Sequence, residues 1–176
     1  MILPVSIIYK PSTCYSSMML HYPEKKILLL FVLFTGLLVS CDSKRIYDEN
    51  IIVENGNWDV RNKMKFDVTI PDTGLRYNIY LKVRNAPEYA YSNLFLFLNT
   101  LFPDGKVSRD TLELTLADYD GRWLGSGIGS VKFSKFLFRQ GIMFRQKGRY
   151  QFEMEQAMRV RDLKGIRDIG LRIEKQ

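Results

Sequence analysis

Strict alternation of apolar and polar side chains is the feature that most constrains how this chain can fold. From Lys63 to Ile70 every second residue is apolar, and a similar alternation returns from Leu75 to Arg84 after the turn residues Pro71 to Gly74. A period of two places alternate side chains on opposite faces of a strand, one face on a core and the other in water. We expect these two runs and their turn to form a β-hairpin.

Further short apolar runs follow at the spacing of about ten residues that is typical of β-sandwiches. They are Tyr91 to Leu101, Thr111 to Ala117, Val131 to Phe138, Ile142 to Phe144, Tyr150 to Met154 and Ile169 to Ile173. The first of them contains five consecutive apolar residues, which is typical of a central strand covered on both faces. Helical periodicity is limited to one expected turn within residues 157–165. The pattern predicts an all-β protein with a single antiparallel, jelly-roll-like β-sandwich.

A charge-free run of thirteen residues, Ile27 to Val39, follows two lysines near the N-terminus. As a helix it would span about 20 Å, which is short of the roughly 30 Å hydrocarbon core of a bilayer. We therefore expect residues 1–40 to be an export signal. Met18 or Met19 is a more ordinary start for such a signal, because it leaves 23 or 22 residues before Cys41.

The apolar run ends in a tetrapeptide that resembles the lipobox of bacterial lipoproteins. Its residues are Leu38, Val39, Ser40 and Cys41. The resemblance implies cleavage before the cysteine, a diacylglycerol on its thiol and acylation of the new N-terminus. Several acyl chains, at about 0.8 kcal/mol per buried methylene, anchor a protein stably where one chain would not. The alternative is an ordinary secretory signal with an incidental cysteine. We expect a lipidated tether and first strand over residues 41–53, and the β-sandwich over residues 54–176.

The composition of the chain from Cys41 onward excludes several classes of function. Removing residues 1–40 takes away the single histidine, one of two cysteines, three of 26 basic residues and one of 19 acidic residues, leaving a net charge of +5. Without histidine, the mature chain has no Ser-His-Asp or Cys-His arrangement and no histidine-ligated zinc site. No nucleic-acid recognition motif is present either. We expect no cofactor and no small-molecule ligand.

Two carboxylate pairs could carry chemistry, although each has a plainer interpretation. Glu153 and Glu155 share one side of an expected strand, with a separation that could suit glycoside hydrolysis, but they alternate with apolar residues like a solvated strand face. Asp118 and Asp120 could ligate calcium through oxygen, but the other ligands of a calcium loop are missing, which favours a polar turn.

Three other features have both a binding and a structural interpretation. The glycine-rich stretch from Gly121 to Gly129 resembles a phosphate-binding loop only weakly, and close backbone packing explains it better. Tyr89 and Tyr91, with Trp58 or Trp123, could stack on sugar rings, although aromatic residues at alternate strand positions are more often core. Residues 121–152 contain basic residues and no acidic one, which suits either an anionic partner or a dispersed solvated face; they are Arg122, Lys132, Lys135, Arg139, Arg145, Lys147 and Arg149.

Several short motifs resemble those of the gliding-motility lipoprotein GldH family of Bacteroidota. They are Tyr91-Ser92-Asn93-Leu94, Asp110-Thr111-Leu112, Gly121-Arg122-Trp123-Leu124-Gly125, Gly148-x-Tyr150-x-Phe152, Gln156-x-Met158-Arg159 and Leu163-x-Gly165-Ile166-x-Asp168-Ile169-Gly170-Leu171. The resemblance implies a cell-envelope lipoprotein required for surface gliding and associated with the type IX secretion machinery. It implies no catalytic residue, and it makes other gliding and secretion proteins of the envelope the expected partners.

We expect a protein without enzymatic activity that a lipid confines to a membrane, which raises its effective concentration toward envelope partners. The outer membrane is the expected location. The residues expected to meet a partner are Arg122, Trp123, Met158, Arg159, Arg161 and Lys164. A surface glycan-binding lipoprotein is the alternative function.

Overall fold

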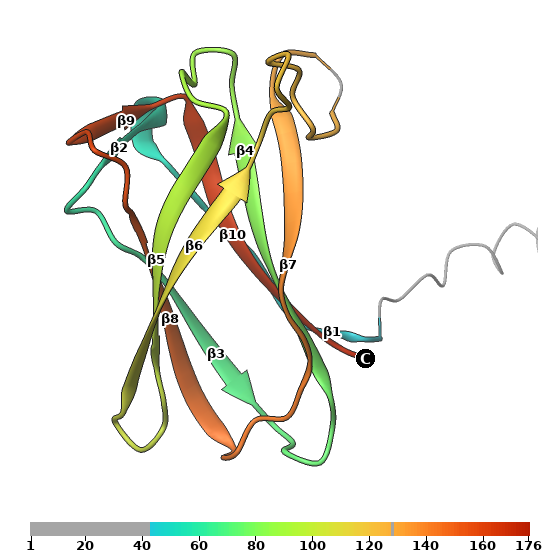
Figure 1. Ribbon diagram of the computed structural model, residues 1–176. Coiled ribbons are helices and arrows are strands. Elements are labelled where there is room, and N and C mark those ends of the chain that lie inside the picture. Colours follow the sequence, from blue (N-terminus) through green and yellow to red (C-terminus); the bar gives the residue numbers. More distant parts are fainter. Residues whose placement is uncertain (1–42, 128) are drawn as a thin grey trace, which may run out of the picture. The chain divides into compact units, whose positions relative to one another are not determined.

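The computed structural model describes residues 43–127 and 129–176 (Figure 1). The expected export signal, its lipobox and Cys41 therefore lie outside the described residues. The elements are β1 (Arg45–Ile52), the short 3-10 helix η1 (Glu54–Gly56), β2 (Asn57–Asp59), β3 (Met64–Ile70), β4 (Tyr77–Asn85), β5 (Asn93–Leu101), β6 (Val107–Thr115), β7 (Lys132–Ile142), β8 (Gly148–Gln156), β9 (Asp162–Lys164) and β10 (Ile166–Lys175). In this part of the chain no helix has the length and apolar character needed to cross a membrane.

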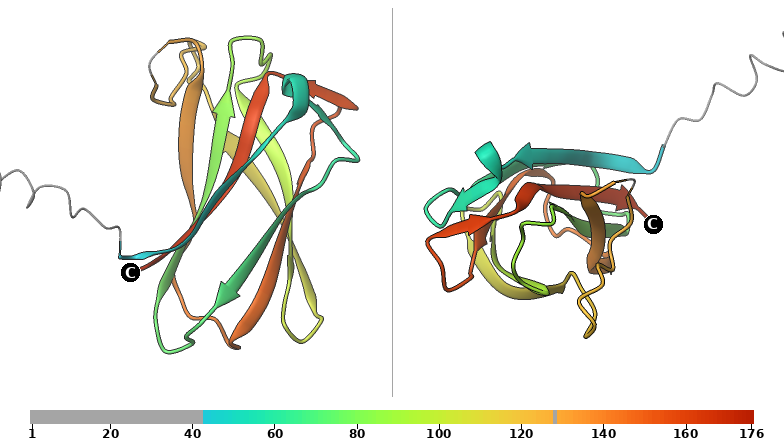
Figure 2. Two further views of the ribbon diagram at one scale, coloured as in Figure 1. Left: turned by 180° about the vertical axis from the view of Figure 1, so that it is seen from behind. Right: turned by 90° about the horizontal axis from the view of Figure 1, so that it is seen from above.

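Two four-stranded antiparallel sheets face each other, as the view from above in Figure 2 shows. One sheet has the order β1-β10-β4-β7 and the other β3-β8-β5-β6, while β2 and β9 form a small separate pair. If β2 and β9 are set aside and the other strands are counted from one to eight, the orders become 1-8-3-6 and 2-7-4-5. This is the strand order of a jelly roll. The all-β sandwich expected from the sequence is confirmed.

Alternating side chains build the core between the sheets. In β3 the buried residues Met64, Phe66, Val68 and Ile70 alternate strictly with exposed ones. The buried core cluster extends from Val53 to Ile173. Residues 42–176 form a compact unit with this core inside it, so we expect this part of the chain to fold by itself.

The expected hairpin between the first two alternating runs is wrong. β3 pairs with β8, whereas β4 pairs with β10 and β7, so the turn at residues 71–76 carries the chain from one sheet to the other. The physical reason is that alternation shows only that each strand has one apolar face. Here the two apolar faces pack against each other across the core, and the strands do not lie side by side.

Two smaller expectations also fail. Residues 157–165 contain β9, which pairs with β2, and not a helical turn. Ile142 to Phe144 is not a separate strand, because β7 continues to Ile142 and Phe144 lies in the following loop, packed edge-on against Tyr77 and Tyr150. In contrast, β5 is central as expected, between β8 and β6, although its outward residues are only half-buried.

Candidate functional site

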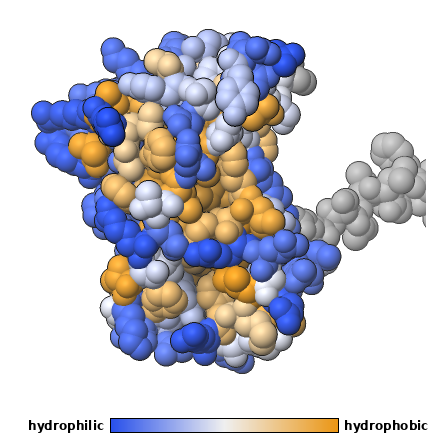
Figure 3. All heavy atoms as spheres, in the orientation of Figure 1, coloured by the Kyte–Doolittle hydropathy of each residue, from blue (hydrophilic) through white to orange (hydrophobic). Residues whose placement is uncertain are grey.

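A cleft of about 600 Å³ opens between β6 and β7, the neighbouring edge strands of the two sheets. The face drawn in Figure 3 looks onto this side, where apolar residues extend from the interior to the surface. Side chains of the core form its floor, and the loop between β7 and β8 forms one wall. The apolar lining includes Ile79, Phe102, Phe138, Phe144, Tyr150 and Phe152.

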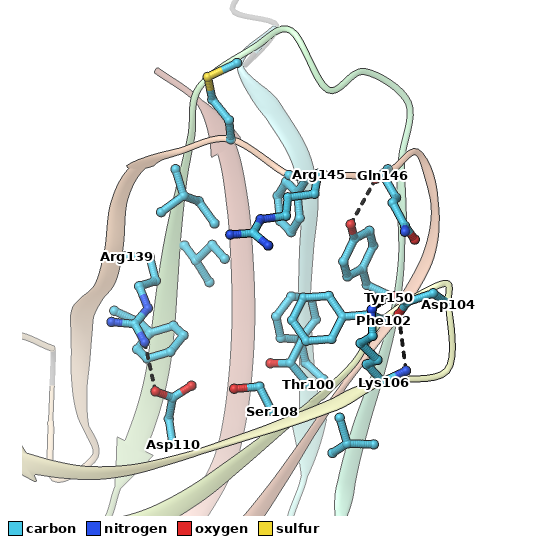
Figure 4. Close-up of a pocket in the computed structure, with 17 residues that line it drawn as sticks. Thr100, Phe102, Asp104, Lys106, Ser108, Asp110, Arg139, Arg145, Gln146 and Tyr150 are labelled. Carbon is cyan, nitrogen blue, oxygen red and sulfur yellow. Dashed lines mark hydrogen bonds and ion pairs between the residues drawn. The ribbon is translucent and has the colours of Figure 1, made fainter.

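The inward side of β6 explains why the sandwich is open here. Leu112 and Leu114 continue the core, but the preceding inward positions are Ser108 and Asp110. Polar side chains gain little from closing over an apolar core, so β6 stays apart from β7 at this point. Instead, the Arg139 guanidinium of β7 donates a hydrogen bond to the Asp110 carboxylate at 2.8 Å, and this ion pair crosses one side of the cleft (Figure 4).

The lining of the cleft carries one cation more than it has carboxylates. Lys106 is paired with Asp104 at 2.8 Å, as Arg139 is with Asp110, whereas Arg145 has no ion pair among the described residues. The Tyr150 hydroxyl donates to the main-chain carbonyl of Gln146 at 2.9 Å, and burial raises the pKa of this tyrosine. The cleft can therefore accept an apolar group that carries negative charge. Among the described residues, no hydrogen bond joins the Ser108 hydroxyl of its lining to the neighbouring Asp110 carboxylate.

A second hollow contains part of the expected partner surface. It is a shallow groove of about 500 Å³ lined by Tyr91, Phe95, Ala157, Met158, Arg159 and Val160, and we call it the Met158 groove. The main-chain N–H of Ala157 donates to the Phe95 carbonyl at 2.9 Å, which ties the groove's loop to β5.

Of the expected partner residues, the structure connects Trp123 with Met158 and Arg159. Trp123 packs near Tyr89, with ring centroids 6.4 Å apart, and Tyr89 packs on Tyr91, so an aromatic row joins Trp123 to the Met158 groove. Arg161 follows the groove in the chain, with its guanidinium 3.9 Å from Asp59. Lys164 lies on β9. Arg122 holds the turn before Trp123.

The sugar-stacking pair does not form a platform. Tyr89 is only 3% exposed, its hydroxyl donates to the Asn93 carbonyl, and burial raises its pKa. Trp58 is fully buried, and its indole N–H donates to the Asn62 carbonyl at 2.6 Å. Tyr91 remains exposed, but one ring without its neighbour is an ordinary surface aromatic.

Glu153 and Glu155 lie beside each other as expected, but as partners of a cation. Lys63 Nζ is 2.9 Å from one carboxylate and 2.7 Å from the other, and Asn99 donates to both. Burial alone would raise the pKa of Glu153, but the hydrogen bond and charge of Lys63 outweigh it and hold the pKa below its usual value. A general acid of a glycosidase needs the opposite shift.

Asp118 forms a tight turn with Arg122. Its carboxylate accepts from the main-chain N–H groups of Asp120 and Arg122 and from the Arg122 side chain, all within 3.0 Å. This is the geometry of a polar turn. Close packing explains two glycines of the stretch from Gly121 to Gly129: a β-carbon on Gly125 would lie 2.8 Å from the Phe133 carbonyl oxygen, and one on Gly127 would lie 2.6 Å from the Val131 carbonyl oxygen. Nothing in the described part of the chain lies within 4 Å of an added carbon at Gly121 or Gly129.

Three of the seven basic residues in segment 121–152 pair with acidic residues, and one of them is Arg122, which pairs with Asp118. Arg139 pairs with Asp110, and Arg149 pairs with Asp67 of β3. Arg145 and Lys147, in the loop between β7 and β8, are exposed, and no ion pair is recorded for them within the described ranges. Sequence reasoning missed the cleft, whose one signal was the interruption of the apolar inward row at Ser108 and Asp110.

Comparison with known proteins gives a consistent result. The family described as GldH lipoprotein matches residues 45–173. The chain is 38% identical over 153 residues to a "Gliding motility lipoprotein GldH homolog" of Christiangramia forsetii, covering 83% of this chain and 93% of that protein. It is 36% identical over 154 residues to the "Gliding motility lipoprotein GldH" of Flavobacterium johnsoniae, covering 84% and 95%.

Proposed function

The chain belongs to the GldH lipoprotein family, and from this we propose that it is a lipid-anchored component of the gliding apparatus that works by binding other envelope proteins. The observation that carries the proposal is the family match, which extends from the first strand of the sandwich to the last. Two separate hollows of the described chain are suited to binding, the cleft between β6 and β7 and the Met158 groove. Neither hollow presents a catalytic pair of side chains.

The proposed anchor is lipid on Cys41, placed in the outer membrane. The lipobox and the lipoprotein relatives support it. We expect Cys41→Ala to move the protein from the membrane fraction and to remove the acyl mass from its N-terminus. Ser43→Ala, two residues after the cysteine, is the control and should leave both unchanged. Equal membrane partition of the two variants would contradict lipidation at Cys41.

The proposed partners are envelope proteins of the gliding and type IX secretion machinery. Confinement to a membrane raises the effective concentration of the domain toward them, so that modest surfaces suffice. The Met158 groove supports this role because it combines partly exposed apolar side chains with the exposed cation of Arg159, at residues where the family resemblance lies.

A strain lacking the protein should lose both colony spreading and type IX cargo export. Complementation with Met158→Asp/Arg159→Glu should fail although the protein is made at normal levels, whereas Thr111→Glu, on an exposed position of β6, should complement fully. Normal spreading and export in the deletion strain would refute the proposed function.

A further inference from the structure

One end of the sandwich collects three loops and the first residues of the described chain. We call it the tether end; it comprises residues 43–45, 71–76, 101–107 and 143–147. The Lys175 N–H donates to the Lys44 carbonyl and the Gln176 N–H to the Arg76 carbonyl, so both chain ends of the domain meet the turn between β3 and β4 here. Tyr77 at the end of that turn is opposite Ile142, where β7 ends.

The other sheet brings its loops to the same end. Ile70 pairs with Gly148 at the start of β8, and Gln151 of β8 pairs with Leu101 at the end of β5. Phe102 and Phe144, from two of the loops, both pack edge-on against Tyr150 of β8. The distance between ring centroids is 5.7 Å for Phe102 and Tyr150 and 4.8 Å for Phe144 and Tyr150. Figure 1 shows the three loops together at the lower end of the sandwich.

Exposed apolar side chains project from every loop of the tether end. They are Leu75 at 37%, Leu101 at 40%, Phe102 at 36%, Val107 at 64% and Met143 at 53% exposure. The lining of the cleft includes Phe102, Val107 and Met143, so apolar surface is continuous from these loops into the cleft.

The charge of the tether end is strongly positive. It carries six basic residues (Lys44, Arg45, Arg76, Lys106, Arg145 and Lys147) and two acidic ones (Asp72 and Asp104), a net charge of +4. Exposed apolar side chains surrounded by lysine and arginine suit a bilayer interface, where the apolar groups enter the acyl boundary and the cations meet phosphates.

We propose that the tether end is a membrane-contacting surface that lies on anionic phospholipid headgroups. The orientation rests on the proposed lipid at Cys41: the four residue-to-residue steps from Cys41 to Arg45 span at most about 14 Å, so the lipid would hold this end next to the bilayer. The apolar loops and the basic side chains then supply a second membrane signal, which fixes the orientation of the domain and leaves the opposite end free to face the envelope partners.

The test uses the unlipidated chain 42–176, so its result does not depend on lipidation. We expect it to sediment with phosphatidylglycerol vesicles at millimolar lipid, to bind phosphatidylcholine vesicles far less, and to be released by salt. Met143→Asp/Lys147→Glu should lower the bound fraction at least about tenfold. Near-ultraviolet circular dichroism checks that this variant is folded.

The matched control makes the same kinds of change at the opposite end, one apolar residue to aspartate and one lysine to glutamate. This variant, Leu124→Asp/Lys132→Glu, should bind like the unaltered chain. Leu124 is 61% exposed there. Absence of binding by the unaltered chain, equal binding to both lipids, or equal loss in both variants would overturn the proposal. The Cys41→Ala fractionation remains a separate test of the anchor.

Discussion

At the scale of single residues, Gly165 is the position where the backbone leaves least room. It has a φ of +88°, and a β-carbon there would lie 2.3 Å from the main-chain nitrogen of Tyr89. Its N–H donates to the Gly56 carbonyl and its own carbonyl accepts from Ala86, each within 2.9 Å. The segment before β10 is thereby held against two loops, which keeps β9 and the Met158 groove in place.

Replacing Gly165 by alanine should destabilise the domain by about 2–5 kcal/mol, because it adds overpacking to the cost of a left-handed backbone. Gly105→Ala is the control: its φ is +80°, but nothing lies within 4 Å of the added carbon, so we expect a loss of only about 1–2 kcal/mol. Urea unfolding of chain 42–176 measures both. Equal losses would show that steric contact at Gly165 is unimportant.

At the scale of elements, β1 is held to its sheet by charged side chains on the outer face. Asp48 pairs with Arg172 of β10 at 2.8 Å and also with Lys82 of β4, one strand further on. Lys82 reaches it by crossing Gly170, where a β-carbon would lie 2.6 Å from the lysine Cε. The absence of a side chain at Gly170 therefore allows one carboxylate to join three strands.

This carboxylate should make β1 sensitive to acid. Burial would raise the pKa of Asp48, but the hydrogen bonds and charges of Lys82 and Arg172 outweigh it and lower the pKa below its usual value. A lowered folded-state pKa contributes stability that is complete above the unfolded value near 3.9 and is lost as pH falls through the folded value.

With Asp48→Asn, the thermal unfolding midpoint should therefore fall less steeply as the pH drops below about 4. The same variant should destabilise the domain at pH 7 by about 1–3 kcal/mol, because Lys82 is left largely buried without its carboxylate. Scanning calorimetry from pH 7 to pH 2 measures both effects. Glu49→Gln, on the neighbouring exposed position of β1, serves as the control. An unchanged acid slope in Asp48→Asn would refute this account.

At the scale of the whole molecule, the first and last strands of the jelly roll pair with each other. β1 covers β10 along nearly its full length, from Arg45 opposite Glu174 to Ile52 opposite Asp168. β1 is the first strand expected within residues 41–53, and it belongs to the four-stranded sheet β1-β10-β4-β7. Without it, β10 would become an edge strand with unpaired main-chain groups and an apolar inner face.

We expect chain 54–176 to aggregate or to lose most of its soluble monomer in size-exclusion chromatography, whereas chain 45–176, which keeps β1 and lacks only the residues before it, should remain monomeric like chain 42–176. The reason is that an exposed, apolar edge strand pairs readily with other chains. A stable, monomeric chain 54–176 would show that β1 is dispensable.

Much of the fold could be predicted from local pattern, and little of the pairing. The alternation predicted a strand from Lys63, and in the structure β3 begins at Met64. The run of five consecutive apolar residues predicted that β5 is central, as it is. The same alternation wrongly paired β3 with β4. The candidate site shows the same division: Met158 and Arg159 do line one groove, but Tyr89 is buried and cannot stack on a sugar.

The sequence alone determined that the chain is made of short strands with one apolar face, that a tetrapeptide resembling a lipobox precedes them, and that the chain after it lacks histidine. These are properties of neighbouring residues and of composition. Only the tertiary structure decided that Asp110 faces Arg139 across an open cleft, that Lys63 neutralises Glu153, and that the cations of three loops gather at one end. Such pairings join residues far apart in the chain, so they depend on strand order and register, which no local pattern encodes.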